Sequence, residues 1–409
     1  MKGELSELDK GLEFNPTSFI ADKVTEIRNT IRSDKAVIAC SGGVDSTTCA
    51  VLTRRAIGDN LICVFIDTNF MRLGEPRRVY ETLISPPFEL PLRLVRSQRR
   101  FMKALAGLED AEEKRKAFRE AFYSVLSQVA VEEGCSFLVQ GTILPDVLET
   151  VKGIKTQHNV LEQIKIRPKE AYGFQVIEPL VELYKFQVRE VARNLGMPLE
   201  ATERQPFPGP GLSVRVVGEI TPEKLTAEKR VTRVVERKLE ALTPNQYFAA
   251  ILDGVKVAYD KAEKARSAVK GLLKSRMVLV KVEALKTKAT GIRGGVRLYG
   301  RVVLVEVRDR GRHCINLPAE TLDLIQKSVI SLDGEASRVL YRLTDVERNG
   351  RWVVAVRSVE TVDFVTASVS DIPWRVLRDT GRLIMNMERG VSAVYYDITP
   401  KPPASIEFE

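Results

Sequence analysis

The sequence predicts an α/β fold: a parallel sheet with helices on both faces, followed by a smaller α+β domain that contains an internal repeat. Three observations support this prediction. In the first half, short apolar runs with little alternation are separated by helical patterns, as in parallel strands that are buried on both faces. Residues 204–212 then hold three prolines and two glycines, which no regular element accommodates. In the second half, Val-rich strands recur at a nearly constant spacing.

The length of the chain indicates two domains. Its 409 residues exceed what one hydrophobic core normally holds, and a composition of 44% hydrophobic and 29% charged residues is typical of a folded protein. We expect one domain over 1–203 and a second over 204–409. Within the second domain, we expect tandem units at about 275–347 and 348–409.

The first domain contains a regular series of elements. A helix over 17–32 follows an Asn-Pro-Thr start signal, and a strand over 36–40 leads through a Gly-containing turn into a second helix. Two further strands end near Asp67 and Gly141. Residues 99–133 are helix-forming and densely charged, and another helix ends at Gly196 and Pro198.

The second domain opens with two helical stretches, at about 222–242 and 244–274, and then becomes rich in strands. Within it, GRVVLVEVR at 300 recurs as GRWVVAVR at 350, and GEASRVLYRLTD at 334 recurs as GVSAVYYDIT at 390. The offsets of 50 and 55 residues predict two similar strand–helix–strand units. A chance likeness of Val-rich strands is the alternative.

Charge and residue counts limit the chemistry. The net charge of +9 indicates an anionic partner, either a nucleotide, nucleic acid or an acidic protein, although scattered basic residues also suit a solvated surface. With only His158 and His313, a multi-histidine zinc site is excluded. Five cysteines without C-x-x-C spacing, and an N-terminus without an apolar signal segment, predict a cytoplasmic protein with buried thiols and no membrane-spanning segment.

The motif SGGVDS directly follows a predicted strand and precedes a helix. Amides at such a Gly-rich turn point into one concavity, and the helix N-terminus favours an anion there. A carboxylate facing phosphates requires a cation, so we assign Asp45 to Mg²⁺. The lysine of a Walker A loop is missing, and a simple helix-capping turn is the alternative. The predicted phosphate site comprises Ser41, Gly42, Gly43, Val44, Asp45 and Ser46.

SGGVDS resembles the PP-loop of the N-type ATP pyrophosphatases, which have an adenine nucleotide alpha-hydrolase-like fold. Other motifs together look like GMP synthetase, in its ATP-pyrophosphatase and dimerisation portion, and this resemblance runs from about residue 17 to the C-terminus. They are FIDTNFMRLGE, LVQGTILPDVLET, GIKTQHNV, VIEPLVELYKFQVREVARNLGMP, RQPFPGPGLSVRVVGEI and YYDITPKPPASIEFE.

The resemblance implies a two-step reaction. O2 of xanthosine 5′-monophosphate (XMP) attacks the α-phosphate of ATP, which expels pyrophosphate, and ammonia then displaces AMP to give GMP. Asp45 with Mg²⁺ and the loop amides would neutralise the leaving pyrophosphate. We expect Asp67, Gly141 and Asp146 to join the ATP site, because they follow predicted strands at the edge where ligands bind open α/β sheets. Loop capping is the alternative for the two aspartates.

Lys155 and His158, in GIKTQHNV, match the mobile lid of the family. The resemblance implies that the lysine reaches ATP phosphates and that the histidine orders the closed state, so both are predicted catalytic residues with Asp45. This sequence departs from the family at Gln157, where relatives carry a second histidine, and at Leu161-Glu162, which replaces Gly-Gly. A purely structural histidine is the alternative.

The resemblance also implies a binding site for XMP. Arg115 matches an arginine near the substrate phosphate, although an ordinary helix-surface position is an equal alternative. Arg204 belongs to RQPFPGPGL. Lys401 would contact the phosphate, and Glu407 the ribose or base. In KTKATGIRGGVRLYG, Gly295 replaces an aspartate of the family, so that contact is lost or supplied elsewhere.

The chain lacks the cysteine turn and the His-x-Glu pair of a glutamine amidotransferase. The resemblance therefore implies a synthetase subunit that receives ammonia from a separate amidotransferase subunit. The alternatives are another PP-loop enzyme, such as NAD synthetase or a tRNA-modifying sulfurtransferase, and a nucleotide- or RNA-binding homologue that has lost catalysis. Since the family pairs through its C-terminal module, the repeat predicts a homodimer or an internally duplicated monomer.

Overall fold

The computed structural model describes residues 14–151, 170, 173–198, 207–273, 277–361 and 365–409. The chain divides into two compact units. The first takes 1–67, 77–97 and 122–204, and the second takes 68–76, 98–121 and 205–409. The second unit is the larger of the two, unlike the expected smaller domain, because two segments from the first half of the sequence belong to it.

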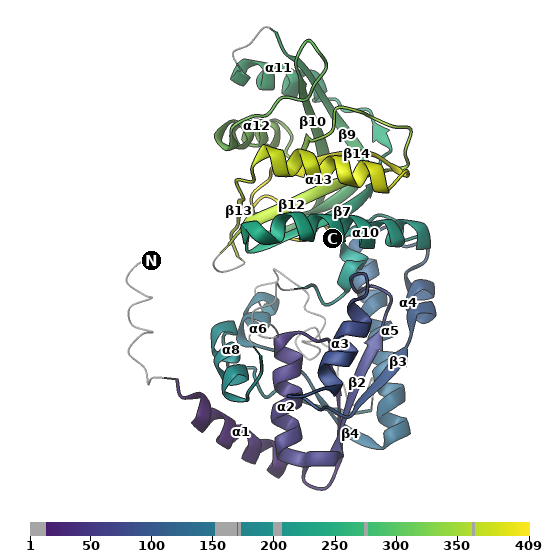
Figure 1. The fold of residues 1–409 in the computed structure, drawn as a ribbon, viewed down its shortest axis with the longest axis vertical. Helices are drawn as coiled ribbons and strands as arrows, with labels where there is room; N and C mark the ends of the chain where they lie inside the picture. Colours follow the sequence, from purple (N-terminus) through teal and green to yellow (C-terminus); the bar gives the residue numbers. More distant parts are fainter. Residues whose placement is uncertain (1–13, 152–169, 171–172, 199–206, 274–276, 362–364) are drawn as a thin grey trace. The chain divides into compact units, whose positions relative to one another are not determined.

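The first unit is built on a parallel sheet of five strands in the order β3-β2-β1-β4-β5, which confirms the predicted α/β class. Helices flank this sheet, and α1, α2 and α8 pack together (Figure 1). The elements are α1 (Pro16–Ile31), β1 (Lys35–Ala39), α2 (Val44–Ile57), β2 (Leu61–Asp67), α3 (Glu75–Ile84), β3 (Leu92–Arg96), the end of α5 (Ala111–Glu133), β4 (Cys135–Val139), α6 (Leu144–Val151), β5 (Gln175–Ile177) and α8 (Lys185–Asn194), with a 3₁₀ turn at Gly58–Asn60. The part of α5 up to residue 121 belongs to the second unit.

Helix α1 begins where its sequence signal predicts. The side chain of Asn15 accepts hydrogen bonds from the amides of Thr17 and Ser18 at 3.0 and 3.1 Å, and Pro16 occupies the first helical position. The predicted helical region 99–133 forms two helices, α4 (Gln98–Leu105) and α5, which are interrupted around Gly107.

The second unit contains one sheet of nine strands, in the order β6-β7-β12-β14-β11-β10-β9-β8, with β13 paired to β12. Its remaining elements are β6 (Val216–Val217), α10 (Pro222–Leu239), β7 (Gln246–Asp253), β8 (Lys256–Val257), α11 (Ala262–Leu273), β9 (Leu279–Arg293), β10 (Val296–Arg308), α12 (Ala319–Leu332), β11 (Ala336–Arg342), β12 (Trp352–Glu360), β13 (Ser368–Val369), α13 (Trp374–Met387) and β14 (Val391–Asp397), with 3₁₀ turns at Gly211–Val214 and Glu240–Leu242.

The predicted helix over 244–274 is wrong in its first part. Strand β7 occupies Gln246–Asp253 and only α11 is helical. Nearly every residue of β7 is buried, so its sequence lacks the polar alternation that distinguishes a half-exposed strand. Periodicity alone cannot separate such a strand from a buried helix.

The Pro/Gly-rich break contains a glycine that no other residue could replace without rearrangement. Gly211 has φ +63°, and a Cβ built on it would lie 2.3 Å from the carbonyl oxygen of Phe70. The next amide, of Leu212, donates to that same oxygen at 2.7 Å. This close approach attaches the segment 68–76 to the second unit.

The described part of the chain contains no helix whose length and apolar character would let it cross a membrane. All five cysteines are buried free thiols, as predicted.

One buried carboxyl group in the second unit makes stability depend on pH. Glu228 on α10 is fully buried, and its Oε1 accepts from the Thr232 hydroxyl at 2.7 Å. Its Oε2 has no hydrogen-bond partner among the described residues. Burial raises the pKa of Glu228 well above its ordinary value. The stability that this group contributes is therefore present below its unfolded pKa, and it is lost as pH rises through the folded pKa.

We therefore expect Glu228→Gln to raise Tm at pH 8 by roughly 2–4 °C and to change it little at pH 5. The neutral amide removes the cost of an unpaired buried charge, and that cost is absent when the carboxyl group is protonated. Calorimetry at the two pH values measures the effect, with the exposed Glu240→Gln as control. An equal shift at both pH values would contradict the assignment.

Candidate active site

The SGGVDS loop connects β1 to α2 at the carboxyl edge of the parallel sheet. Gly42 has φ +77°, and a Cβ on it would lie 2.6 Å from Cγ1 of Val79 in α3. Gly43 is the N-cap of α2 and provides no side-chain cap. The first turn of α2 therefore presents backbone amides and the positive end of the helix dipole without a capping side chain, which is the arrangement that binds an anion.

Two serine hydroxyls close this loop. Oγ of Ser41 and Oγ of Ser46 are 3.0 Å apart, and the amide of Ser41 donates to Oγ of Ser46 at 3.2 Å. The Ser46 hydroxyl is 3.2 Å from the carbonyl oxygen of Gly43, to which it donates. The loop is thus held by exchangeable hydroxyl contacts, and the same hydroxyls are donors for an oxyanion.

Asp45 lies in the first turn of α2 and pairs with a lysine that lies 140 positions later in the sequence. Its Oδ2 is 2.6 Å from Nζ of Lys185, which opens α8. Its Oδ1 is buried and has no hydrogen-bond partner among the described residues. An ionised carboxylate with one unsatisfied buried oxygen is costly. The site therefore contains a carboxylate oxygen, Oδ1 of Asp45, that can accept a hydrogen bond or bind a cation, next to the ammonium group of Lys185.

Gly141 follows β4 and lies against the loop. A Cβ on Gly141 would be 2.9 Å from the amide nitrogen of Ser46 and 3.0 Å from the carbonyl carbon of Asp45. The preceding residue, Gln140, is anchored by its amide to the Ile177 carbonyl of β5 at 2.9 Å. The ends of β1 and β4 therefore converge on the same loop.

The two predicted aspartates differ in their surroundings. Asp67 is the last residue of β2 and pairs in register with Arg96 of β3, at the same edge of the sheet as the loop. Asp146 lies in the first turn of α6, and its Oδ2 accepts from the amide of Ile143 at 3.1 Å. Asp146 therefore makes the capping contact that was the alternative reading of its position. Binding of ATP by either residue stays a prediction.

Arg115 belongs to a small charged group on the second unit. Its guanidinium is 3.3 Å from Glu112, which also pairs with Arg297 of β10 at 3.1 Å. Burial, followed by the charge of Arg115, lowers the pKa of Arg297. Two arginines that share one carboxylate leave an excess of positive charge, which suits a phosphate.

Lys401 and Glu407 lie in the C-terminal segment of the second unit. Lys401 is nearly buried, and its backbone forms a two-way bridge with Ala367, with N···O distances of 2.8 and 2.9 Å. Both carboxylate oxygens of Glu407 accept from Arg215, at 2.8 and 2.9 Å. The predicted contact of Glu407 with ribose or base would have to share this carboxylate with Arg215.

Three predicted residues, Lys155, His158 and Arg204, lie outside the described residues. Gly295 is described, and it forms with Gly294 the two-residue turn between β9 and β10. Their φ values are +78° and +57°. Such a turn favours residues that tolerate positive φ, and glycine does so at both central positions.

Sequence reasoning missed Lys185 and Arg215. Lys185 had a usable signal, because a lysine at the N-terminus of a helix without acidic residues in its first turn is unfavourably placed unless it has a distant partner. Arg215 had none that we recognise. It is fully buried and stacks on Phe248, with the guanidinium carbon 3.9 Å from the ring centroid.

Two family descriptions match the chain. Residues 16–201 match the PP-loop domain, and residues 343–408 match the GMP synthase C terminal domain. The second match covers only the last part of the nine-stranded unit.

Curated relatives match the chain over nearly its whole length. The B subunit of GMP synthase (glutamine-hydrolyzing) from Sulfurisphaera tokodaii is 40% identical over 398 residues, which cover 97% of this chain and 100% of the relative. The same protein from Methanopyrus kandleri is also 40% identical, over 403 residues, with the same coverage. That of Archaeoglobus fulgidus is 37% identical over 392 residues, which cover 96% of this chain and 98% of the relative. The loop, the parallel sheet that carries it and this full-length similarity agree, and the chain belongs to the family of GMP synthase B subunits.

Proposed function

We propose that this chain is a ligase that carries out the synthetase half of GMP formation. O2 of XMP attacks the α-phosphorus of ATP, and the bond to pyrophosphate breaks. Ammonia then adds at C2 of the purine, and AMP leaves with the former O2. The products are GMP, AMP and pyrophosphate.

The observation that carries this proposal is the SGGVDS loop with its Asp45 carboxylate. The loop combines uncapped helix amides, two hydroxyls and a carboxylate with one unsatisfied buried oxygen. Amides and hydroxyls suit phosphate oxygens, whereas a carboxylate near phosphates requires a cation between them.

The residues present fit Mg²⁺. Oδ1 of Asp45 is a hard oxygen acceptor without a protein partner among the described residues, which is the kind of ligand that Mg²⁺ takes from a protein while phosphates supply others. When bound, Mg²⁺ would supply positive charge against the pyrophosphate oxygens. Asp45 is the residue that we assign to hold it.

The other residues of the first unit would bind and orient the triphosphate. The amides of Gly43 and Val44 and the hydroxyls of Ser41 and Ser46 donate to its oxygens. Lys185, whose Nζ lies 2.6 Å from Oδ2 of Asp45, would donate to a phosphate oxygen beside that carboxylate. Positive charge that is in place before the reaction stabilises the leaving pyrophosphate without reorganisation.

In this proposal Asp67, Gly141 and Asp146 border the ATP site, and Lys155 and His158 act with it as catalytic residues. XMP would be bound by Arg115 together with Arg204, Lys401 and Glu407 of the substrate domain, over 204–409. The ATP pyrophosphatase domain would comprise 1–203.

A separate glutamine amidotransferase subunit would supply the ammonia, as the names of the relatives suggest. We place the reaction in the cytoplasm, where buried free thiols such as the five in this chain remain reduced.

The experiment that tests the function measures AMP and GMP formed from ATP, XMP and an ammonium salt in the presence of Mg²⁺. Equal amounts of AMP and GMP are expected. AMP formed only with another acceptor in place of XMP would indicate a different PP-loop ligase, and binding of nucleotides without turnover would indicate a homologue that has lost catalysis.

We further expect the isolated chain to use ammonium but not glutamine. No cysteine of the chain is available as the nucleophile of glutamine hydrolysis, because all five are buried and desolvation raises the pKa of several, including Cys135 to about 11. Rates with saturating glutamine should stay at the no-nitrogen background. Glutamine-dependent GMP formation by the purified chain at a rate comparable to that with ammonium would contradict this expectation.

A further inference from the structure

In the nine-stranded sheet of the second unit, the six inner strands, from β7 to β9, have the same pairing pattern from the centre outward in both directions. The symmetry ends at the edges, because β6 is parallel to β7 whereas β8 is antiparallel to β9. The two central strands, β14 and β11, are antiparallel, and Tyr341 lies opposite Tyr396, 55 positions later. Each residue of β11 has a counterpart in β14 that lies 55 positions later. If every residue is replaced by its counterpart, the list of paired residues stays the same. The flanking pairs are Leu340 with Asp397 and Arg342 with Tyr395. A pseudo-twofold axis therefore passes through the middle of the sheet.

The symmetry extends to the strands on either side. Strand β10 is parallel to β11 and β12 is parallel to β14, and both pairs shift register at the same place, between Arg301 and Val302 and between Trp352 and Val353. Next outward, β9 is antiparallel to β10, and β7 is antiparallel to β12. Strand β7 is the element for which the sequence pattern wrongly predicted a helix.

The helices follow the same axis. Helices α12 and α13 both have 14 residues, both start after a proline (Pro318 and Pro373), and both are followed by an acidic residue (Asp333 and Glu388). Helix α11 packs on α12 and β9, as α10 packs on α13 and β7. Figure 1 shows these four helices in the order α10, α13, α12, α11.

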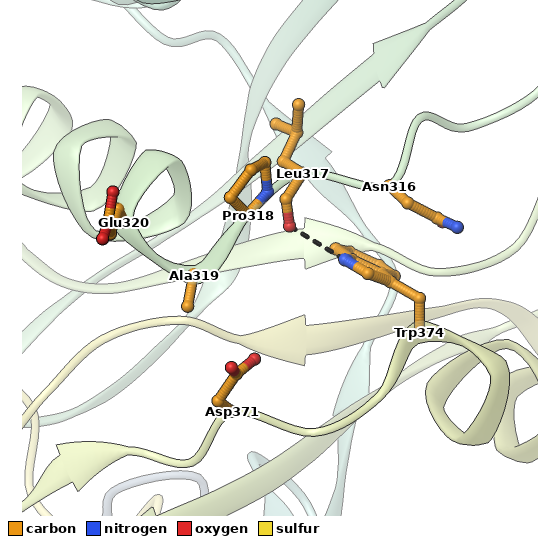
Figure 2. Close-up of a pocket in the computed structure, with 7 residues that line it drawn as sticks. All are labelled: Asn316, Leu317, Pro318, Ala319, Glu320, Asp371 and Trp374. Atoms are coloured by element: carbon orange, nitrogen blue, oxygen red, sulfur yellow. Dashed lines mark hydrogen bonds between the residues drawn. The ribbon is translucent and has the colours of Figure 1, made fainter.

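A pocket of about 540 Å³ marks the place where the starts of α12 and α13 meet (Figure 2). Four of its seven lining residues form two pairs that are 55 positions apart, Asn316 with Asp371 and Ala319 with Trp374. Trp374 closes the junction by donating from Nε1 to the carbonyl oxygen of Leu317 at 2.8 Å. None of the predicted site residues that the structure describes lines this pocket.

The unit therefore consists of two copies, and one is inserted into the other. The first copy is continuous and contains α11, β9, β10, α12 and β11, residues 262–342. The second copy contains α10 and β7, residues 222–253, and then β12, α13 and β14, residues 352–397. The tandem repeat in the sequence covers only the later part of this arrangement.

The C-terminal segment, residues 398–409, follows the second copy, with which Lys401 pairs through Ala367, and it also attaches to the first copy. The amide of Thr290 in β9 donates to the carbonyl of Phe408 at 2.8 Å, and the amide of Ile292 donates to that of Pro403 at 2.7 Å. The Ser405 hydroxyl donates to the Thr290 carbonyl at 2.9 Å. This segment carries Lys401 and Glu407, the predicted contacts to XMP.

One buried arginine from each copy holds this segment. Arg338 of β11 and Arg357 of β12 are both fully buried. They donate to the same carbonyl oxygen, that of Ser405, at 2.9 and 3.0 Å, and to the same carboxylate oxygen of Asp397 at 2.6 and 3.0 Å. Arg338 also lies over the ring of Phe408, at 3.9 Å from its centroid. The segment is therefore positioned by both copies.

In the first copy, Thr344 is the counterpart of Thr399, near the start of the C-terminal segment. Ion pairs occupy the region after Thr344. Arg342 donates to the Thr344 carbonyl at 2.8 Å, as Arg357 donates to the equivalent Thr399 carbonyl at 2.6 Å. After Thr344, however, the chain continues into β12. Glu347 lies 3.4 Å from Arg342 and also pairs with Lys256 at 2.8 Å. Only one of the two equivalent places therefore holds a C-terminal segment.

From these observations we infer that the second unit is an internal pseudo-dimer, in which Arg338 of the first copy positions the substrate segment of the second. One chain then forms one complete nucleotide site and needs no second chain to do so. The assignment of the segment to XMP rests on the proposed function, whereas the role of Arg338 in holding the segment does not. Arg338 is thus a positioning residue that contacts the segment and not the substrate.

The first test compares Arg338→Lys with Arg342→Lys by hydrogen exchange in the full chain without ligand. Both arginines are fully buried on the same strand, and lysine keeps the charge but loses the planar fork that reaches several acceptors. Comparable losses of Tm are expected. Peptides spanning 399–409 should exchange at least about tenfold faster in Arg338→Lys only. Equal changes in both variants, or in neither, would overturn the inference.

The second test uses the reaction. In Arg338→Lys, we expect KM for XMP to rise about tenfold while KM for ATP and kcat change less than about threefold, and Arg342→Lys should keep the wild-type KM. Equal KM values in the two variants would overturn the positioning role. If the wild-type chain makes no GMP, the proposed function fails, and the exchange experiment still decides the role of Arg338.

The third test is the mass in solution together with the number of binding sites. Light scattering between about 1 and 100 μM should give the mass of one chain, 45.8 kDa, and calorimetric titration should give one XMP per chain. A homodimer whose dissociation on dilution abolishes activity would overturn the claim that one chain is sufficient, and so would two XMP per chain.

Discussion

Replacing Asp45 with Asn is expected to lower the rate of AMP and GMP formation by about a hundredfold to a thousandfold, the usual cost of removing one electrostatic contact to a developing charge. Asparagine keeps the size of the side chain and can still accept a hydrogen bond from Lys185, 2.6 Å away, but it loses the charge that holds a cation. Initial rates over a range of Mg²⁺ concentrations measure the effect. The loss should be only partly relieved at high Mg²⁺.

The control for this variant is Asp59→Asn. Asp59 lies just after the same helix, is exposed and pairs at the surface with Arg54, so its loss should leave the rate unchanged. The double variant Asp45→Asn/Lys185→Met should be little worse than Asp45→Asn alone, because both residues act on the same phosphates. A wild-type rate and an unchanged Mg²⁺ dependence in Asp45→Asn would refute the assignment of Asp45.

Adding a single methyl group at Gly141 should reduce kcat/KM for ATP by about tenfold to a hundredfold, since displacement of a phosphate-binding loop by about 1 Å is enough for such a loss. A Cβ at this position would lie 2.9 Å from the amide nitrogen of Ser46, which is backbone and cannot turn aside. The loop must therefore move away from β4. Steady-state kinetics of Gly141→Ala with ATP as the varied substrate measure the change.

Gly271→Ala is the matched control, because this glycine lies inside α11 and a Cβ there meets no atom within 4 Å. We expect unchanged kinetics and a gain in stability of up to about 1 kcal/mol, the difference in helix propensity between the two residues. If Gly141→Ala were as active as Gly271→Ala, the close approach of β4 to the loop would have no role in binding ATP.

Most of the first unit could be predicted from local patterns. The Asn-Pro-Thr signal predicted the start of α1, and apolar runs predicted the strands on either side of the SGGVDS loop. These features are encoded within a few neighbouring residues, because capping, turn geometry and burial on both faces all act over short distances along the chain. The phosphate loop was predictable for the same reason.

The partners of the site residues were not predictable in this way. Lys185 lies 140 positions after Asp45, and no periodicity relates the two. Asp146 could be read from the sequence equally well as a ligand or as a helix cap, and its contact with the Ile143 amide was decided by local geometry. Charges far apart in sequence meet only when the sheet is assembled.

By itself, the sequence determined the α/β class, the position of the phosphate loop and the presence of a repeat, because each depends on short-range patterns. The tertiary structure alone decided that β7 is a strand, that one copy of the repeat is inserted into the other, and that Arg338 and Arg357 meet at Ser405. The physical reason is that strand pairing and buried ion pairs join residues far apart in the chain. A largely buried strand such as β7 and a fully buried arginine leave no local pattern that identifies their partners.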